Sequence, residues 1–384
     1  MTGILTLNTG SSSLKFALYR AAPRLQILLH GQVDRIGKDA TLVVYQEDRK
    51  TSARVEAATP NEALQAVMAF IQRENRNVSV AGVGHRIVHG GPKYAEPVLL
   101  CEERIAELEA LVPLAPLHQP HNLAGIKTAR DVFPNAVQIG CFDTGFHHGH
   151  PWVNDTFALP RHFYDEGIRR YGFHGLSYEY ITGLIAAEYP DLHAGKLVIA
   201  HLGNGASMCA VREGKSVGST MGFSALDGLP MGTRSGQIDP GVILYLLEEK
   251  GMRSSDILHM LYHESGLLGL SGLTSDMRDL LEAGTPEAAQ AIDYYVFRAR
   301  REVGALSAVL GGIDGLVFCG GIGENAKVIR ARIVEGLAYL GIVIDPEKDT
   351  TDARDIGQGG TRVLVIPTDE ERVIARAVRA ALVL

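Results

Sequence analysis

Two arginines lie in segments where an ordinary surface charge is not expected. Arg86 follows a predicted strand in the run 85–91, between two histidines and next to paired glycines, and Arg234 lies in the glycine-rich run 232–236. A guanidinium group binds carboxylate and phosphoryl oxygens through two parallel hydrogen bonds, which an ammonium group cannot do. A solvated surface charge is the alternative for each residue. As a pair, the two arginines could bind an anionic acceptor and the phosphoryl group transferred to it.

Carboxylates and amides near predicted strand ends are candidates for a metal site. Asp143 ends an apolar strand, and Asn8 ends another. Both could hold Mg²⁺ directly or through its waters. Glu370 is a further candidate, because a capping box from Thr368 to Glu371 would occupy Glu371 and leave its neighbour available. The alternative for Glu370 is a first-turn carboxylate favoured by the helix dipole.

The histidines divide into three cases. His174 lies between glycines and beside an aromatic residue, which is typical of a placed hydrogen-bond donor. His118 either begins a helix or acts as a donor in an active site. The run 147–150 contains three histidines, but its spacing fits no standard zinc pattern, so a polar loop is expected there.

Three polar turns rich in glycine, asparagine and serine follow apolar runs. The first spans 8–13, with Lys15 just beyond it; the second spans 202–207 and the third 320–325. Turns with many backbone donors suit phosphate groups, although a plain hairpin turn is the alternative for the first. The spacing GxxxxGKS/T of a Walker loop is absent. The repetition predicts two related lobes that bind one polyanion.

These residues require an alternating framework of strands and helices. Thr285 and Pro286 have the chemistry of a helix start, and Gly311 that of its end. The alternation predicts an α/β fold with at least partly parallel sheets. Strands are expected at 4–7, 16–19, 43–44, 80–88, 136–142, 197–201, 208–211 and 316–319, and helices at 60–75, 120–133, 285–311, after 326 and from 368.

Composition restricts the class of protein. A chain of 384 residues with 46% apolar and 21% charged residues is expected to fold as two domains. No run reaches the roughly 18 apolar residues of a membrane span, and the chain enters a strand without a leader-like segment. A net charge of −7 gives no footprint for nucleic acid. Four scattered cysteines predict reduced core thiols in a cytoplasmic protein.

The sequence resembles the acetate kinase family, within the actin/Hsp70/sugar-kinase superfamily, from end to end. The motifs are NTGSSSLKF (8–16), GHRIVHGG (84–91), PLHQPHNL (116–123), FDTGFH (142–147), RYGFHG (170–175), HLGNGAS (201–207), MGTRSG (231–236), SGLLGLSG (265–272), GGIGENA (320–326) and IPTDEE (366–371). The resemblance implies two related domains of the actin-like ATPase (ribonuclease H-like) type with a nucleotide cleft between them. Residues 1–150 and about 366–384 would form the N-terminal lobe, and 151–365 the nucleotide-binding and dimerisation lobe.

The resemblance also implies reversible transfer of the ATP γ-phosphoryl group to acetate, giving acetyl phosphate and ADP. The cofactor would be Mg²⁺, with Mn²⁺ as a substitute, and the enzyme would be a cytoplasmic homodimer without nucleic-acid or membrane partners. Matched positions are Asn8 and Glu370 for the metal; Asp143, His174, Arg234, Arg86 and His118 for catalysis; and Arg86, Val88, Leu117, Ala225 and Phe173 for acetate. Nucleotide positions are Lys15 with the serines 11–13, His201, Leu202, Gly203, Asn204, Gly205, Asp276, Met277, Arg278, Gly323, Glu324, Asn325, Ala326 and Lys327.

In the family that the sequence resembles, the residue at the position of Asp143 is usually called the catalytic acid/base. Acetate is already ionised at pH 7, and the barrier comes from bringing two anions together in line. We therefore hypothesise that Asp143 positions Arg86, Arg234 or the metal.

The sequence departs from the family at three places. Ala225 stands where the family commonly has proline, which makes propionate kinase the alternative, since one methylene is worth only about 1–3 kcal/mol. Ser177 and Gln237 also replace usual residues. An actin- or Hsp70-like ATPase switch is the alternative from another class, but the two arginines would have no purpose in it.

Overall fold

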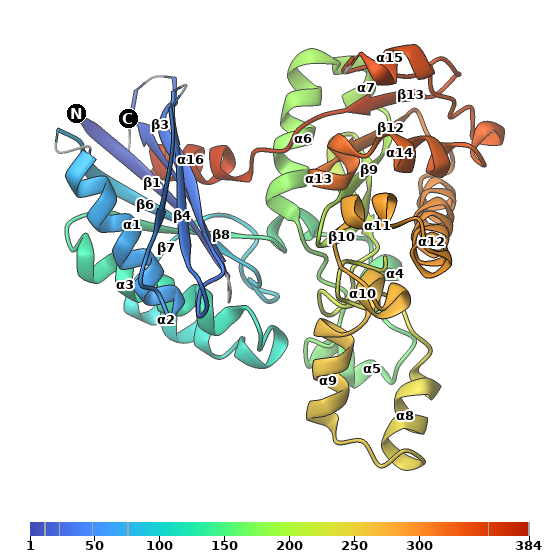
Figure 1. Cartoon of the computed structure of the whole chain (residues 1–384), viewed down its shortest axis with the longest axis horizontal. Helices are drawn as coiled ribbons and strands as arrows, with labels where there is room; N and C mark the ends of the chain where they lie inside the picture. The colour runs from blue at the N-terminus through green and yellow to red at the C-terminus, as the bar shows by residue number, and fades with distance from the viewer. Residues whose placement is uncertain (11–12, 23, 48, 75–76, 352, 383–384) are drawn as a thin grey trace. The chain divides into compact units, whose positions relative to one another are not determined.

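The chain forms two compact units. The computed structural model describes residues 1–10, 13–22, 24–47, 49–74, 77–351 and 353–382. The first unit comprises Met1–Phe146 and the segment from Asp369 onward, and the second comprises His147–Thr368. Each unit contains its own β-sheet (Figure 1). Among the residues described, no helix is both long and apolar enough to cross a membrane.

The sheet of the first unit has the strand order β5-β4-β3-β2-β1-β6-β8-β7. Strands β1 to β5 form an antiparallel meander, whereas β6 and β8 run parallel to β1. The carboxyl ends of β1, β6 and β8 therefore meet at one edge of the sheet. The bounds are β1 (Thr2–Thr9), β2 (Ser13–Arg20), β3 (Gln26–Asp34), β4 (Thr41–Gln46), β5 (Arg49–Arg54), β6 (Ser79–Ile87), β7 (Val98–Leu99) and β8 (Val137–Phe142).

Helices cover this sheet through apolar faces. The predicted face of the first helix is confirmed, because its residues at 63, 64, 67, 68 and 71 are buried. The C-terminal helix packs on β1, β6 and β8. It approaches β6 so closely that a Cβ on Gly84 would lie 2.3 Å from Ile374 Cγ2. The helices are α1 (Pro60–Glu74), α2 (Glu102–Glu109), η1 (Val112–Leu114), α3 (Gln119–Val132), η2 (Gly145–His147) and α16 (Glu370–Ala381).

The sheet of the second unit repeats the topology of the first. Its order is β11-β10-β9-β12-β13, with an antiparallel hairpin β9–β10 and two strands parallel to β9. The series β3-β2-β1-β6-β8 has the same order and the same directions. The predicted α/β class with partly parallel sheets is confirmed. The bounds are β9 (Lys196–Leu202), β10 (Ala206–Arg212), β11 (Lys215–Ser219), β12 (Gly315–Cys319) and β13 (Arg362–Val365).

The longest helix, α12 (Pro286–Leu310), begins and ends as its sequence predicts. Thr285 caps its first turn by accepting a hydrogen bond from Ala288 N, and Gly311 ends it with a φ of 68°. The other helices of this unit are α4 (Trp152–Asp155), α5 (Arg161–Asp165), α6 (Gly175–Glu188), α7 (Pro190–His193), α8 (Pro240–Glu248), α9 (Ser254–His263), α10 (Gly266–Ser271), α11 (Met277–Ala283), α13 (Gly320–Asn325), α14 (Lys327–Val334), η3 (Ala338–Leu340) and α15 (Pro346–Thr350).

Three local predictions are wrong. The third glycine-rich turn is helix α13, whose start is capped because Glu324 Oε1 accepts from Gly320 N at 2.8 Å. Helix α16 is capped by Asp369, which accepts from Arg372 N at 2.9 Å, and no Thr368 capping box forms. The Thr368 hydroxyl is instead 2.8 Å from Ser177 Oγ. The cysteines are thiols, but Cys101 is exposed while the other three are buried.

Candidate active site

In the first unit, Arg86 is held by two carboxylates. Its Nε and Nη2 donate to the two oxygens of Asp143 at 2.8 and 2.7 Å, and its Nη1 lies 3.2 Å from Glu370 Oε2. The Asp143 side chain is only 2% exposed. Burial alone would lower the pKa of Arg86, but the charges of Asp143 and Glu370 raise that pKa above its usual value. The guanidinium is therefore permanently charged and fixed in orientation.

Three segments distant in sequence bring these groups together. Strand β6 carries Arg86, and β8 delivers Asp143, whose backbone N donates to Ile87 O at 3.0 Å. Glu370 lies in the first turn of α16, which packs on the same strands. Arg86, one of the three targets hypothesised for Asp143, contacts it directly.

Asn8 and Glu370 offer oxygen donors for a metal. Asn8 lies at the carboxyl end of β1, beside β6, and pairs with Lys15 across the β1–β2 hairpin. Glu370 is not the free carboxylate predicted from a capping box, because Arg86 contacts it. Its neighbour Glu371 has a raised pKa, caused mainly by burial and then by the charge of Glu370. Ser11 and Ser12 lie outside the described residues.

The donor set fits Mg²⁺ as the metal of a phosphate complex. Among the described residues there is no group of three or more histidine, cysteine and carboxylate side chains that could hold a metal alone. Mg²⁺ usually keeps several waters and binds through one or two carboxylates together with substrate phosphates. The amide of Asn8 and the carboxylate of Glu370 suit this way of binding Mg²⁺ together with substrate phosphates.

The segment before α3 carries two further candidates. Leu117 and His118 are half-buried, and His118 occupies the N-cap position of α3 without a capping hydrogen bond from its side chain. One residue of α3 that sequence reasoning missed fixes Val88. Asn122 Oδ1 accepts from Val88 N at 3.0 Å, and its Nδ2 donates to Thr9 O at 2.9 Å. The position of Asn122 within the motif 116–123 was the only feature of the sequence that could have pointed to it.

In the second unit, His174 is buried and held on two sides. Its Nδ1 lies 2.8 Å from Ser207 Oγ, which also bonds to the Tyr178 hydroxyl. Its ring stacks on that of His201 with 4.3 Å between centroids. The backbone of His174 is left-handed, with a φ of 59°, at the N-cap of α6. Ser177, the residue that departs from the family, bonds to His201 Nδ1 at 2.8 Å.

Arg234 and Gly205 lie beside His174. A Cβ built on Gly205 would be 3.2 Å from His174 Nε2 and 4.0 Å from Arg234 Nη1. The loop of Arg234 rests on the polar turn after β9, because Gly232 N donates to Asn204 O at 3.1 Å. Arg234 Nη1 donates to Ala225 O at 3.2 Å, which joins one expected acetate position to an expected catalytic arginine.

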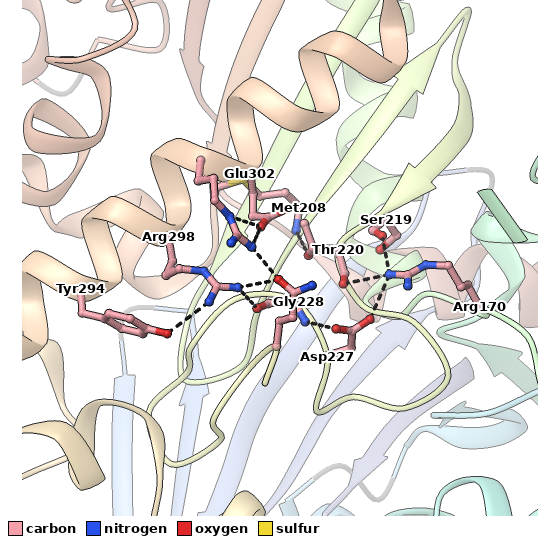
Figure 2. A network of polar contacts seen from close by, with 11 residues as sticks. Arg170, Met208, Ser219, Thr220, Asp227, Gly228, Tyr294, Arg298 and Glu302 are labelled. Atoms are coloured by element: carbon pink, nitrogen blue, oxygen red, sulfur yellow. Dashed lines mark hydrogen bonds and ion pairs between the residues drawn. The ribbon is translucent and has the colours of Figure 1, made fainter. Parts of the chain in front are cut away.

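A network from α12 supports the segment that carries Ala225 and Arg234 (Figure 2). Arg298 donates to Gly228 O at 3.4 Å and to Gln237 Oε1 at 3.0 Å, and Arg301 donates to the same Gln237 oxygen at 2.6 Å. Arg170 anchors the segment through Asp227 at 3.0 Å. Gln237, which replaces a usual acid, thus accepts from two arginines. Sequence reasoning missed Arg298 and Arg301, since helix periodicity marks α12 only as core.

The residues expected to bind the nucleotide differ in burial and in their hydrogen-bond partners. Gly203 lies near the start of α13, since its Cβ would be 3.8 Å from Gly321 N. The side chains of Leu202 and Met277 are buried, so only their backbones could reach a ligand. Glu324, Asn325, Lys327 and Arg278 bond to Gly320 N, Gly321 O, Thr350 O and Asp276 respectively. Asp276 caps α11, Gly323 is buried in α13, and Ala326 joins α13 to α14.

Two histidines of the run 147–150, where a polar loop was predicted, form a buried cluster, whereas His148 is exposed. Ser216 Oγ lies 2.9 Å from His147 Nδ1 and 2.6 Å from His150 Nε2. His147 Nε2 lies 2.9 Å from Phe173 O, so the cluster fixes the backbone next to His174. Burial lowers the pKa of His147 to about 3 and that of His150 to about 4. Phe173 is 2% exposed and belongs to the core around this cluster.

The sequence profile of the acetokinase family matches residues 3–376. The chain belongs to the acetokinase family. An acetokinase-family relative, the acetate kinase of Methylocella silvestris, is 52% identical over 99% of this chain and 98% of its own length. Among solved structures, the acetate kinase of Porphyromonas gingivalis has 34% identity and a TM-score of 0.89, with both chains covered completely. A propionate kinase from Francisella tularensis has 36% identity and a TM-score of 0.92, covering 98% of this chain and 99% of its own.

Proposed function

We propose that this protein transfers the γ-phosphoryl group of ATP reversibly to acetate, giving acetyl phosphate and ADP. The observation that carries the proposal is the guanidinium of Arg86, fixed by Asp143 and Glu370 at the edge of a sheet. A relative named acetate kinase at 52% identity over nearly the whole chain supports the same reaction.

In this proposal the acceptor needs no base. Acetate is an anion at pH 7, so its oxygen attacks phosphorus as it is. Arg86 binds the acetate carboxylate and offsets the repulsion between two anions. Its Nη1, 3.2 Å from Glu370, is the most loosely held of the three nitrogens and the one that would donate to the substrate. Asp143 orients the guanidinium and moves no proton. Val88 and Leu117 in the first unit and Ala225 and Phe173 in the second would exclude larger acids, with His118 as a further donor.

The second unit would supply the nucleotide side of the reaction. His174 and Arg234 would donate to the transferring phosphoryl group, whose transition state spreads negative charge over its oxygens. The turn 201–205, the segment 276–278 and the segment 323–327 would hold ATP or ADP, and Lys15 of the first unit would approach the phosphates. Asn8 and Glu370 would hold Mg²⁺, or Mn²⁺ in its place, which neutralises phosphate charge when bound.

Propionate is a second candidate acceptor. Ala225 is small, and a propionate kinase has 36% identity and a TM-score of 0.92. One more methylene in such a pocket changes discrimination by only about 1–3 kcal/mol. We therefore propose acetate as the preferred acid and propionate as a slower substrate.

Steady-state kinetics with trapping of the acyl phosphate by hydroxylamine tests the function. Acetate, propionate and butyrate are compared with ATP and Mg²⁺. The expected kcat/KM falls in that order, with little product from butyrate. The absence of acyl hydroxamate with all three acids would overturn the proposal.

We further propose a homodimer in the cytoplasm. Helix α8 is apolar but has no buried residue, and its Leu244 and Tyr245 are 55% and 52% exposed. Exposed apolar side chains gathered on one helix are typical of an interface. Sedimentation should give a dimer that Leu244→Glu converts to a monomer, while Tyr339→Glu, at a 76% exposed site elsewhere, leaves it a dimer. A monomeric wild-type protein would contradict this.

The four thiols support a reducing compartment.

A further inference from the structure

The first unit contains a pocket lined almost entirely by arginines. Arg24, Leu25, Arg372, Arg376 and Arg379 surround a space of about 330 Å³. None of these residues contributes a side chain to the candidate active site described above. Arg24 comes from the connection between β2 and β3, and the other three arginines come from α16. Two segments distant in sequence therefore contribute charge of one sign to one place.

The three arginines of α16 follow one face of the helix. They are spaced by four and three residues, so neighbouring guanidinium groups lie on the same side. The opposite face, with Val373, Ile374, Ala375 and Val378, is buried. The helix dipole favours a cation in the last turn, which accounts for Arg379 alone.

The arginines of the pocket differ in their ion pairs. Asp369 Oδ2 accepts from Arg372 Nε at 2.8 Å. Within the part of the chain that the structure describes, neither Arg24 nor Arg376 has an ion-pair partner. Two of the four guanidinium groups of the pocket are thus without an ion pair there, in a chain whose net charge is −7. Like charges at this spacing repel one another on a helix, so a ligand that neutralises them is favoured.

We propose that this pocket binds a small anion that carries two or more phosphate groups. Guanidinium forks match phosphoryl oxygens bidentately, and several forks from two segments match several phosphates. The volume lies in the range of small-molecule sites. A single phosphate would compensate only part of the positive charge, so affinity should rise steeply with the number of phosphates.

Isothermal titration calorimetry with inorganic triphosphate tests the site in the full-length protein. Saturating ADP fills the nucleotide positions first, so that the remaining heat reports a second site. The wild-type protein should bind triphosphate at least tenfold more tightly than inorganic phosphate. The double variant Arg24→Ala/Arg376→Ala should lose at least tenfold in affinity while its kinase activity is unchanged.

The matched control is Arg54→Ala/Arg73→Ala, which removes the same charge from exposed positions elsewhere in the unit. It should bind triphosphate like the wild type. Equal losses in both double variants would mean non-specific attraction, and loss of all triphosphate binding in saturating ADP would mean an active-site ligand only. Either result overturns the proposal, as does equal affinity for phosphate and triphosphate. Acyl phosphate formation is a separate readout, so failure here leaves the proposed reaction standing.

Discussion

Arg86 uses all three of its nitrogens on carboxylates of its own unit. Asp143 takes two of them and Glu370 the third. A carboxylate held in this way has both oxygens occupied by a permanent cation and is poorly suited to accept a proton. The geometry therefore favours a positioning role for Asp143 over the acid/base role suggested by the family resemblance.

Asp143→Asn separates these two roles. The amide can accept only one of the two hydrogen bonds from Arg86, so the guanidinium loses its fixed orientation. Misplacement of such a group by about 1 Å costs roughly 100-fold in rate, and we expect kcat to fall by about that factor. The pH–rate profile should keep its shape with a lower plateau. Disappearance of a titrating limb in the variant would show that Asp143 transfers a proton.

Gly205→Ala tests the space between His174 and Arg234. The new methyl would lie 3.2 Å from His174 Nε2, and that ring cannot retreat easily because Ser207 and His201 hold it. We expect kcat to fall roughly tenfold or more, since small displacements of oriented groups are costly.

The control is Gly183→Ala in helix α6, where a Cβ meets no atom within 4 Å. It should keep full activity and raise stability by about 0.5–1 kcal/mol, as alanine replaces glycine inside a helix. Equal activity of both variants would show that Gly205 is not near the reacting groups.

At the scale of elements, local signals predicted most of the framework. The hairpins on either side of the turns 8–13 and 202–207 follow from polar turns between apolar runs, and α12 follows from Thr285 and Gly311. The start of α16 was misplaced, because Thr368 and Asp369 are both good caps and only tertiary contact decides between them. The contact of Arg86 with Asp143 and Glu370 could not be predicted from spacing, since it depends on two strands and the C-terminal helix meeting at one edge of the sheet.

The hydrogen bonds that join helix α3 to the first sheet can also be tested by substitution. Asn122 joins Val88 N to Thr9 O and is 4% exposed. Asn122→Ala leaves the part-buried donor of Val88 and the buried acceptor of Thr9 unpaired, which should destabilise the protein by about 1–3 kcal/mol. Because Val88 is an expected acetate contact, the KM for acetate should also rise several-fold. Denaturant unfolding and acetate titration measure the two effects.

The exposed Lys127→Ala on the same helix is the control and should change neither quantity. A destabilised Asn122→Ala enzyme with an unchanged acetate KM would exclude a role of this link in the acceptor pocket.

At the scale of the whole molecule, one strand topology carries two different sets of candidate site residues. In the first sheet the ends of β1, β6 and β8 carry Asn8, Arg86 and Asp143. In the second, the hairpin β9–β10 carries the polar turn that lies near His174 and Arg234. The sequence motifs predicted both sets of residues. The equal strand order of the two sheets became evident only from the pairing of their strands.

The buried histidines of both units should make the free energy of unfolding depend on pH. Burial lowers the pKa of His85, His89 and His150 to about 4, and that of His147 to about 3, whereas an unfolded histidine titrates near 6.5. Between these values the unfolded chain binds more protons, so the free energy of unfolding decreases as pH falls. At pH 5.5 each histidine costs about 1.4 kcal/mol relative to pH 7.5. Glu371, whose pKa is raised, acts in the opposite direction.

Thermal unfolding at pH 7.5 and 5.5 measures this effect, and the His147→Gln/His150→Gln variant isolates two of the four groups. Its Tm difference between the two pH values should be about half that of the wild type, because the glutamines do not titrate. His148→Gln is the matched control, since this histidine lies in the same segment but is exposed. It should leave the difference unchanged. A wild-type Tm that is equal at both pH values would mean that the buried histidines are not kept neutral by the fold.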